Sequence, residues 1–95
     1  MTHGVARLYK TDTPADQAAA TMQKNRTEDV ALNEGWVRSL CLQLDDGRVG
    51  VIAGYGAEEH RDYHSDANRR HAPAIEAIRA VFPEAPEEIK TLYHT

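Results

Sequence analysis

The sequence lacks most of the features that mark specialised classes of protein. It contains a single cysteine, so no disulfide can form within the chain, and this favours a reducing compartment such as the cytoplasm. No apolar run approaches the length that spans a bilayer, and the first residues do not resemble a signal peptide. We therefore expect a cytoplasmic protein with no membrane partner.

Basic charge is also scarce. The chain has 11 lysines and arginines against 15 aspartates and glutamates, which gives a net charge of −4. A nucleic-acid-binding protein shows clustered basic residues and a high pI, so we expect no nucleic-acid partner. Gly54 and Gly56 begin a pattern similar to G-x-G-x-x-G, but Glu59 stands where the third glycine is needed. We expect no cofactor.

What remains is the composition of a small globular protein. The 95 residues are 41% hydrophobic and 27% charged, and the sequence shows no internal repeat or low-complexity tract. A chain of this length can bury a core without disulfides or metals. We expect one domain over residues 1–95.

The most regular stretch predicts a β-hairpin with strands at 36–44 and 49–56. Asp46-Gly47 is typical of a two-residue type I′ turn, because both turn positions need a positive φ. That turn places Leu44 opposite Val49. Side chains then alternate between faces, and one face forms a predicted core: Arg38, Leu40, Leu42, Leu44, Val49, Val51, Ala53 and Tyr55. The other face is predicted to be nearly bare, because three of its positions are glycine: Val37, Ser39, Cys41, Gln43, Gly50, Ile52, Gly54 and Gly56.

Further elements lie on both sides of the hairpin. Residues 4–10 alternate as a strand, with Val5, Arg7 and Tyr9 on one side. Thr13-Pro14 predicts a helix start, and this helix has one narrow face of small residues: Ala15, Ala18, Ala19 and Met22. Residues 25–35 fit either a short helix or an extended lead into the hairpin.

The second half of the chain leaves two choices open. Residues 57–64 are densely charged and favour a solvated loop, and an apolar helical stripe follows up to Phe82. Pro73 falls inside that stripe, where it either kinks the helix or begins a new one. Residues 89–93 are a final strand or a last helical turn. The expected fold is an α+β domain with an antiparallel sheet built on the hairpin and two helices on one face, in the order β-α-β-β-α(-β). With the last strand, this matches the ferredoxin-like plan.

Three histidines form a weak candidate metal site. On a helix, His60 and His64 share one face, which is a workable half-site for zinc or nickel. His71 lies about 10 Å further along the helix axis, too far to share one ion. We therefore assign no metal ligand and expect the group to be a solvated, charged segment.

The bare face of the hairpin is the candidate binding surface. Glycines inside a strand often mark the close approach of another backbone or a ligand, and Trp, Tyr and Arg are enriched in binding hot spots. The candidate residues for a protein partner are Ser39, Cys41, Gly50, Ile52 and Gly54 of the bare face, with Trp36, Arg38 and Tyr55 at the open end of the hairpin. Ordinary packing at the end of a strand would explain the aromatic residues equally simply.

The leading hypothesis is a small non-catalytic module that binds another protein as a regulator, inhibitor or subunit, with a homodimer as one form. No catalytic residue is assigned, because the sequence shows no nucleophile with a matching base. The alternative is a small dimeric α+β-barrel enzyme, or a metal-binding protein, that uses the group of His60, His64 and His71.

Overall fold

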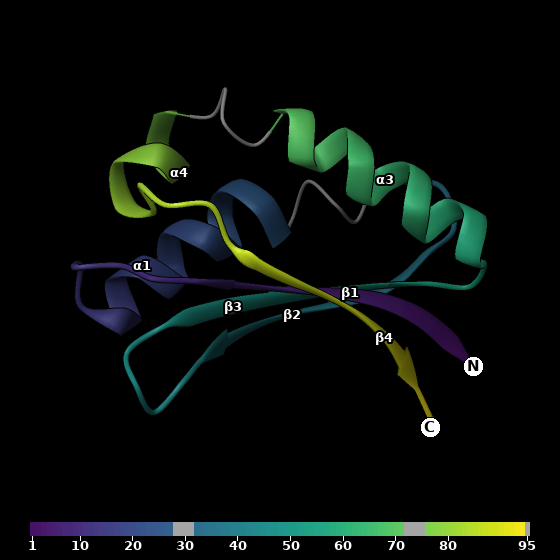
Figure 1. Ribbon diagram of the computed structural model, residues 1–95, viewed down its shortest axis with the longest axis horizontal. Helices are drawn as coiled ribbons and strands as arrows, with labels where there is room; N and C mark the ends of the chain where they lie inside the picture. Colours follow the sequence, from purple (N-terminus) through teal and green to yellow (C-terminus); the bar gives the residue numbers. More distant parts are fainter. Residues whose placement is uncertain (28–31, 72–75, 95) are drawn as a thin grey trace.

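The computed structural model describes residues 1–27, 32–71 and 76–94. Within these residues, four strands form one antiparallel sheet in the order β2-β3-β1-β4, and the helices lie on one face of it (Figure 1). The strands are β1 (Thr2–Tyr9), β2 (Trp36–Gln43), β3 (Val49–Tyr55) and β4 (Glu87–Tyr93). The helices are α1 (Ala15–Met22), α3 (Glu58–His71) and α4 (Glu76–Val81), with a π-helical turn, η1 (Gln23–Thr27), after α1. The predicted fold class and ferredoxin-like order are confirmed.

β1 lies inside the sheet, between β3 and β4. Val5 of β1 faces Ala53 on one side and Lys90 on the other. Residues 89–93, for which a strand and a helical turn were both open, belong to β4. Because Thr2 pairs with Tyr93, the two chain ends lie at the same end of the sheet (Figure 1).

The turn between β2 and β3 differs from the predicted type I′ turn. The Gly47 amide donates to the Leu44 carbonyl at 3.0 Å, and the Leu44 amide donates to the Arg48 carbonyl at 2.9 Å. Gly47 has a φ of 90°. This is the usual three-residue hairpin loop, a type I turn followed by a glycine in the left-handed region. The extra loop residue moves the strand pairing by one position.

The shift exchanges the two faces of β2. Cys41 faces the helices, where its Sγ lies 3.5 Å from the Ala19 carbonyl oxygen, whereas Leu40 is 50% exposed on the opposite face. The predicted leucine core of β2 is therefore wrong. The prediction holds for β3, where Val49 is fully buried. Because β2 has apolar residues on both sides, only the turn could determine which side faces the helices.

α1 packs its small side chains against the sheet, as the spacing predicted. Ala18 and Met22 are fully buried, and Ala15 and Ala19 pack against the same cluster. Small side chains let the helix axis lie close to the strands. The other buried members of this core are Tyr9, Val49, Ile78 and Phe82.

The charged segment 57–64, expected to be a loop, is instead largely the first half of α3. Glu58 and Arg61 form an ion pair of 3.6 Å one turn apart, which supports a helix that has no strong apolar stripe. Pro73 and residues 28–31 lie outside the described residues, so the choices that depended on them stay open. In the described ranges, no helix is both long and apolar enough to cross a membrane.

The sheet face opposite the helices is left open, and we call it the open face (Figure 1). Gly4 and Gly54 lie side by side on it. A Cβ at either glycine would come within 2.9 Å of the Tyr93 ring. The close approach that these strand glycines predicted is therefore made by a side chain of β4.

Candidate functional site

A cavity of about 420 Å³ opens between β1, α4 and the segment that joins α4 to β4. Its walls are mainly apolar and include Tyr9, Ile78, Phe82, Pro83, Ala85 and Pro86. Its polar lining consists of Arg7, Arg79, Glu84 and Glu88. We call it the Arg7 cavity. Apolar walls with a few convergent polar groups are typical of small-molecule sites.

Arg7 is the most unusual residue in this lining, because it is charged and only 6% exposed. It occupies the helix-facing side of β1 between Val5 and Tyr9, since alternate residues of a strand share a face. Its Nε donates to Glu88 Oε2 at 3.1 Å. A buried charge is tolerated when it is paired and hydrogen-bonded, and Arg7 meets both conditions.

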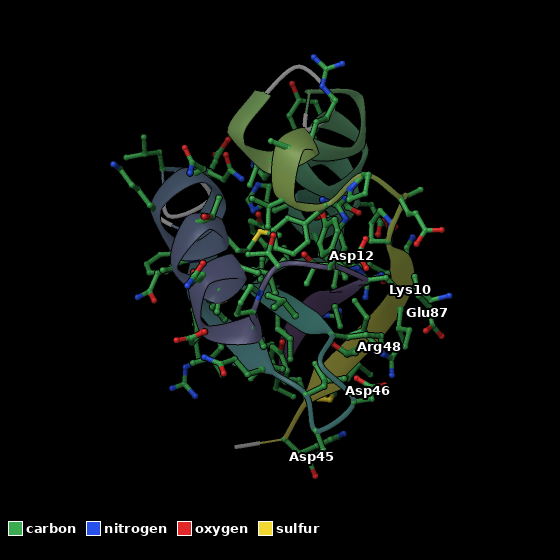
Figure 2. All side chains as sticks on the ribbon, turned by 90° about the vertical axis from the view of Figure 1, so that its left-hand side faces the viewer. Lys10, Asp12, Asp45, Asp46, Arg48 and Glu87 are labelled. Atoms are coloured by element: carbon green, nitrogen blue, oxygen red, sulfur yellow. The ribbon has the colours of Figure 1, made fainter. Side chains whose placement is uncertain are left out.

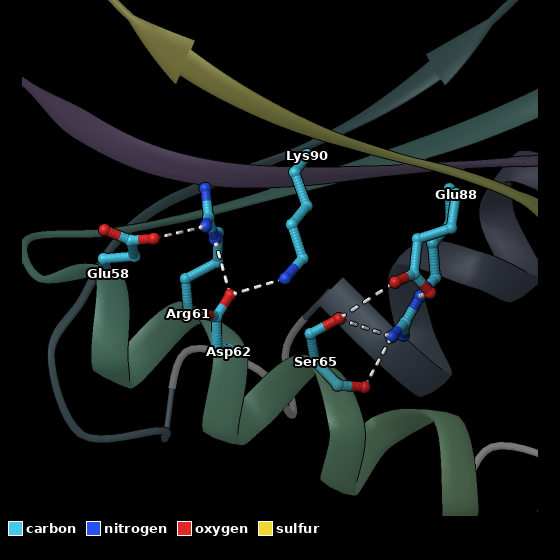
Figure 3. Close-up of polar contacts among 7 residues, drawn as sticks. Glu58, Arg61, Asp62, Ser65, Glu88 and Lys90 are labelled. Atoms are coloured by element: carbon cyan, nitrogen blue, oxygen red, sulfur yellow. Dashed lines mark hydrogen bonds and ion pairs between the residues drawn. The ribbon is translucent and has the colours of Figure 1, made fainter.

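Ser65 of α3 completes the setting of this arginine (Figure 3). Arg7 Nη2 donates to the Ser65 carbonyl oxygen at 2.7 Å and to Ser65 Oγ at 3.2 Å. Ser65 Oγ in turn lies 3.3 Å from Glu88 Oε1 and donates to it. Three elements thus close one ring of hydrogen bonds, and Nη1 of Arg7 carries none within the described part of the chain.

The aromatic wall of the cavity comes from β1 and α4. The rings of Tyr9 and Phe82 lie 5.0 Å apart with an angle of 51° between their planes, a favourable tilted arrangement. Both residues are buried, and Phe82, which directly follows α4, lies one turn after Ile78. This wall suits a flat apolar occupant.

A second ionic group ties α3 to β4 outside the cavity (Figure 3). Lys90 Nζ and Arg61 Nε each lie 3.0 Å from Asp62 Oδ1. These hydrogen bonds, first that of Lys90 and then that of Arg61, hold the pKa of Asp62 below its usual range. Lys90 and Asp62 are more exposed than Arg7 and Glu88. The buried Arg61 is already paired with two carboxylates, so this group supports the α3–β4 contact rather than a binding site.

The far end of the sheet, near the hairpin turn, is also charged (Figure 2). Arg48 lies 2.8 Å from Asp46 and 3.4 Å from Glu87. With two carboxylates beside it, this arginine is already neutralised and offers little to an anionic ligand.

His60 and His64, the weak candidate half-site, each contact a residue of another part of the chain. His64 stacks on Tyr55, with ring centroids 5.4 Å apart, whereas the His60 ring packs against Gly35. The side chain of His71 lies outside the description. Among the side chains that are described, no group of three or more histidine, cysteine or acidic residues is placed to hold a metal ion.

The candidate binding residues of the hairpin are divided between the two faces of the sheet. The helix-facing ones are Trp36, Ser39, Cys41 and Tyr55, and those on the open face are Arg38, Gly50, Ile52 and Gly54. The longer turn moves Ser39 and Cys41 to the helix-facing side and Arg38 to the open face. A bulge between Trp36 and Arg38 keeps Trp36 on the helix-facing side. The eight residues therefore do not make one surface.

Sequence reasoning did not single out the residues that line the Arg7 cavity. Arg7 and Glu88 are 81 positions apart, and Arg7 and Ser65 are 58 apart, so no motif joins them. One signal was present: Arg7 shares a strand face with Val5 and Tyr9. A charged residue on an otherwise apolar strand face indicates a buried partner or a site.

No protein-family model and no curated protein matches the sequence. Solved structures do match in fold. A monooxygenase of Streptomyces coelicolor, solved with nanaomycin D, superposes with a TM-score of 0.71 at 14% identity over 99% of this chain and 88% of its own. SnoaB of Streptomyces nogalater, a cofactor-independent oxygenase, gives 0.70 at 14% identity over 99% and 94%. A Bordetella bronchiseptica protein proposed to be an antibiotic biosynthesis monooxygenase gives 0.72 at 9% identity over 99% and 98%. The fold is shared.

These neighbours correct the leading hypothesis from the sequence. Those with a stated activity are oxygenases, so a non-catalytic regulator, inhibitor or subunit is no longer the best reading of this chain. The alternative, a small α+β-barrel enzyme, fits the neighbours better. The cavity lining differs from that alternative in one respect: its described residues include Arg7 and Glu88 and no histidine.

Proposed function

We propose that this protein is a small oxygenase that binds a flat, mainly apolar compound with an acidic C–H or phenolic O–H group in the Arg7 cavity. One observation carries the proposal: a buried arginine with unused donors lines an apolar cavity, in a fold shared with oxygenases. The SnoaB neighbour is a cofactor-independent oxygenase, and the chemistry proposed here likewise draws its electrons from the substrate.

Arg7 supplies the electrostatic part of the reaction. Loss of a proton from the substrate puts negative charge on its oxygen, and the two N–H groups of Nη1 are the donors left to receive it. A cation within about 4–6 Å lowers the pKa of such an acid by roughly 1–3 units, so bound substrate ionises near neutral pH. The surrounding apolar wall strengthens this effect by excluding water.

The resulting anion reduces dioxygen. A methylene carbon conjugated with the anionic oxygen loses two hydrogens and gains one oxygen atom, and the second oxygen atom leaves as water. One methylene compound and one dioxygen thus give one ketone and one water, so the atoms balance without an external reductant. The chain's part is to bind the substrate, stabilise its anion and keep bulk water away.

The test uses anthrone, an apolar tricyclic acid of this kind, with an oxygen electrode and chelator present. We expect oxygen uptake and anthraquinone in equal amounts, faster than without protein. Arg7→Met should lower the rate by about 10–100-fold, because one pKa unit of lost stabilisation is tenfold less anion. Arg7→Lys should retain part of it, and Arg48→Met, which removes an arginine outside the cavity, should have no effect. A rate equal to the protein-free rate would rule out this substrate class.

We also propose that two copies associate through the open face. Apolar side chains from all four strands lie on it: Leu8, Leu40, Leu42, Ile52 and Ile89. The middle of this face is apolar, with Arg38 towards one end of β2, and such a face is suited to its own copy across a two-fold axis. Leu40→Glu should convert the dimer to a monomer in sedimentation equilibrium. Leu92→Glu is the matched control, since Leu92 is 48% exposed against 50% for Leu40 but lies on the helix-facing side.

A further inference from the structure

We infer that Ser65 is a positioning residue, which holds the Arg7 guanidinium open towards the cavity and so sets the preference of the site for an anionic occupant. The inference rests on the proposed function of the Arg7 cavity. It assigns a role to a residue of α3 that does not line the cavity. Ser65 is only 2% exposed, and all of its described side-chain bonds go to Arg7 and Glu88.

The geometry differs from that of an ordinary arginine–carboxylate pair. Such pairs tend to form two parallel bonds, with two guanidinium nitrogens on the two carboxylate oxygens. Here only Nε of Arg7 meets Glu88, at Oε2. The Ser65 hydroxyl occupies the second position, because it accepts from Nη2 and donates to Oε1. The Ser65 hydroxyl thus lies between Nη2 of Arg7 and Oε1 of Glu88.

This insertion has an electrostatic consequence. If the hydroxyl is removed, Oε1 of Glu88 loses one donor and Nη2 of Arg7 loses one acceptor. The two groups can then close into the two-bond pair, in which Glu88 neutralises the arginine more completely. Arg7 is then a weaker partner for an anion in the cavity, while the apolar walls are unchanged.

Ser65→Ala is expected to leave the fold intact, because the backbone of Ser65 makes its shortest hydrogen bond to Arg7. Its carbonyl oxygen accepts from Arg7 Nη2 at 2.7 Å, the shortest bond in the group, and Ser65→Ala leaves that bond in place. The substitution therefore tests the hydroxyl alone. Ser65→Thr restores a hydroxyl at the same position.

The experiment compares two dyes that share an aromatic framework. Anilinonaphthalene sulfonate is an anion, and N-phenylnaphthylamine is its neutral counterpart. Each is titrated by fluorescence against the purified full chain, with circular dichroism to check that every variant is folded. For Ser65→Ala we expect the Kd of the anionic dye to rise about tenfold, because Glu88 then neutralises Arg7 more completely, and the Kd of the neutral dye to stay the same. Ser65→Thr should restore the anionic dye. Ser39→Ala, which removes a hydroxyl bonded to Trp36, should change neither.

The outcomes separate the two claims. An equal loss for both dyes would show a merely structural role, and no loss for either would show that the hydroxyl does not matter; both results overturn the inference. Arg7→Met tests the proposed function itself and should abolish the preference for the anionic dye. If Arg7→Met passes this test and Ser65→Ala does not, only the inference about Ser65 fails.

Discussion

Two of the ion pairs that connect β4 to its neighbours are expected to differ greatly in their contribution to stability. Glu88 and Arg7 are 3.1 Å apart, and Lys90 and Asp62 are 3.0 Å apart, so their lengths do not distinguish them. Burial does. Arg7 and Glu88 are 7% and 20% exposed, whereas Lys90 and Asp62 are 54% and 40% exposed.

The expected magnitude follows from what each substitution leaves behind. Glu88→Gln leaves the buried Arg7 guanidinium without its counter-charge, and breaking a buried pair in this way costs about 3–5 kcal/mol. We expect the lower end, about 3 kcal/mol, because the bonds to Ser65 remain. At about 4–8 °C per kcal/mol, the Tm falls by roughly 12 °C or more. Lys90→Gln removes a pair that solvent already screens, so the Tm should hardly change.

The assay is urea and thermal unfolding followed by circular dichroism. All variants are measured at one protein concentration, because association makes the apparent stability concentration-dependent. The double variant Arg7→Met with Glu88→Gln removes both charges and should recover part of the loss. If Lys90→Gln destabilises the protein as much as Glu88→Gln, burial does not separate the two pairs and the reasoning fails.

Three further predictions concern other parts of the molecule. Gly54→Leu should lower the free energy of unfolding by about 1–3 kcal/mol in a urea titration, because its Cβ would overlap Thr2 and Tyr93; a neutral result would mean that both neighbours can move aside. Burial raises the pKa of the Cys41 thiol, so iodoacetamide should label it more slowly in the native protein than in urea at the same pH. The hydrogen bonds from Lys90 and then Arg61 lower the pKa of Asp62, so its stabilisation is present above its unfolded value of 3.8 and is lost as the pH falls through the lower folded value. The difference in stability between wild type and Asp62→Asn should therefore shrink below pH 3.8, and a difference that is constant from pH 7 downwards would contradict this.

The sequence predicted those parts of the fold in which one pattern had one explanation. The i, i+3, i+4 spacing of small residues in 15–22 fits only a helix face, and Ala18 and Met22 are indeed fully buried. The alternation in β3 is equally clear, because Gly50 and Gly54 on the opposite face alternate with apolar residues such as Val49 and Ala53. Element order then sufficed for the ferredoxin-like plan.

The predicted register of the hairpin was wrong because neither the alternation of apolar residues in β2 nor the turn sequence determined it. In β2, Leu40 and Cys41 are both compatible with burial, so alternation could not choose between the faces. The choice was left to Asp46-Gly47, and this dipeptide serves a two-residue turn and the last two positions of a three-residue loop equally well. A difference of one residue in the loop is enough to turn Leu40 outwards.

Only one residue of the site, Arg7, had a signal in the sequence. Arg7 stood on an apolar strand face, but its partners come from α3 and β4, and neither has a local signature. The first half of α3 was expected to be a loop because it shows no clear apolar stripe, whereas its described contacts include the polar ones of Ser65 and Asp62. Long-range charge pairing leaves no period in the sequence.

The same contrast explains where the cavity lies. α1 and α4 meet the sheet through an apolar cluster that includes Met22 and Phe82, whereas α3 is joined to β1 and β4 by hydrogen bonds and ion pairs. The Arg7 cavity opens at the boundary between these two kinds of packing, with Phe82 on one wall and Arg7 on another. An occupant at this boundary meets apolar surface and a charge together, without disturbing the buried core. A compound that is flat, apolar and anionic at one edge matches both walls, which is why we place the proposed chemistry there.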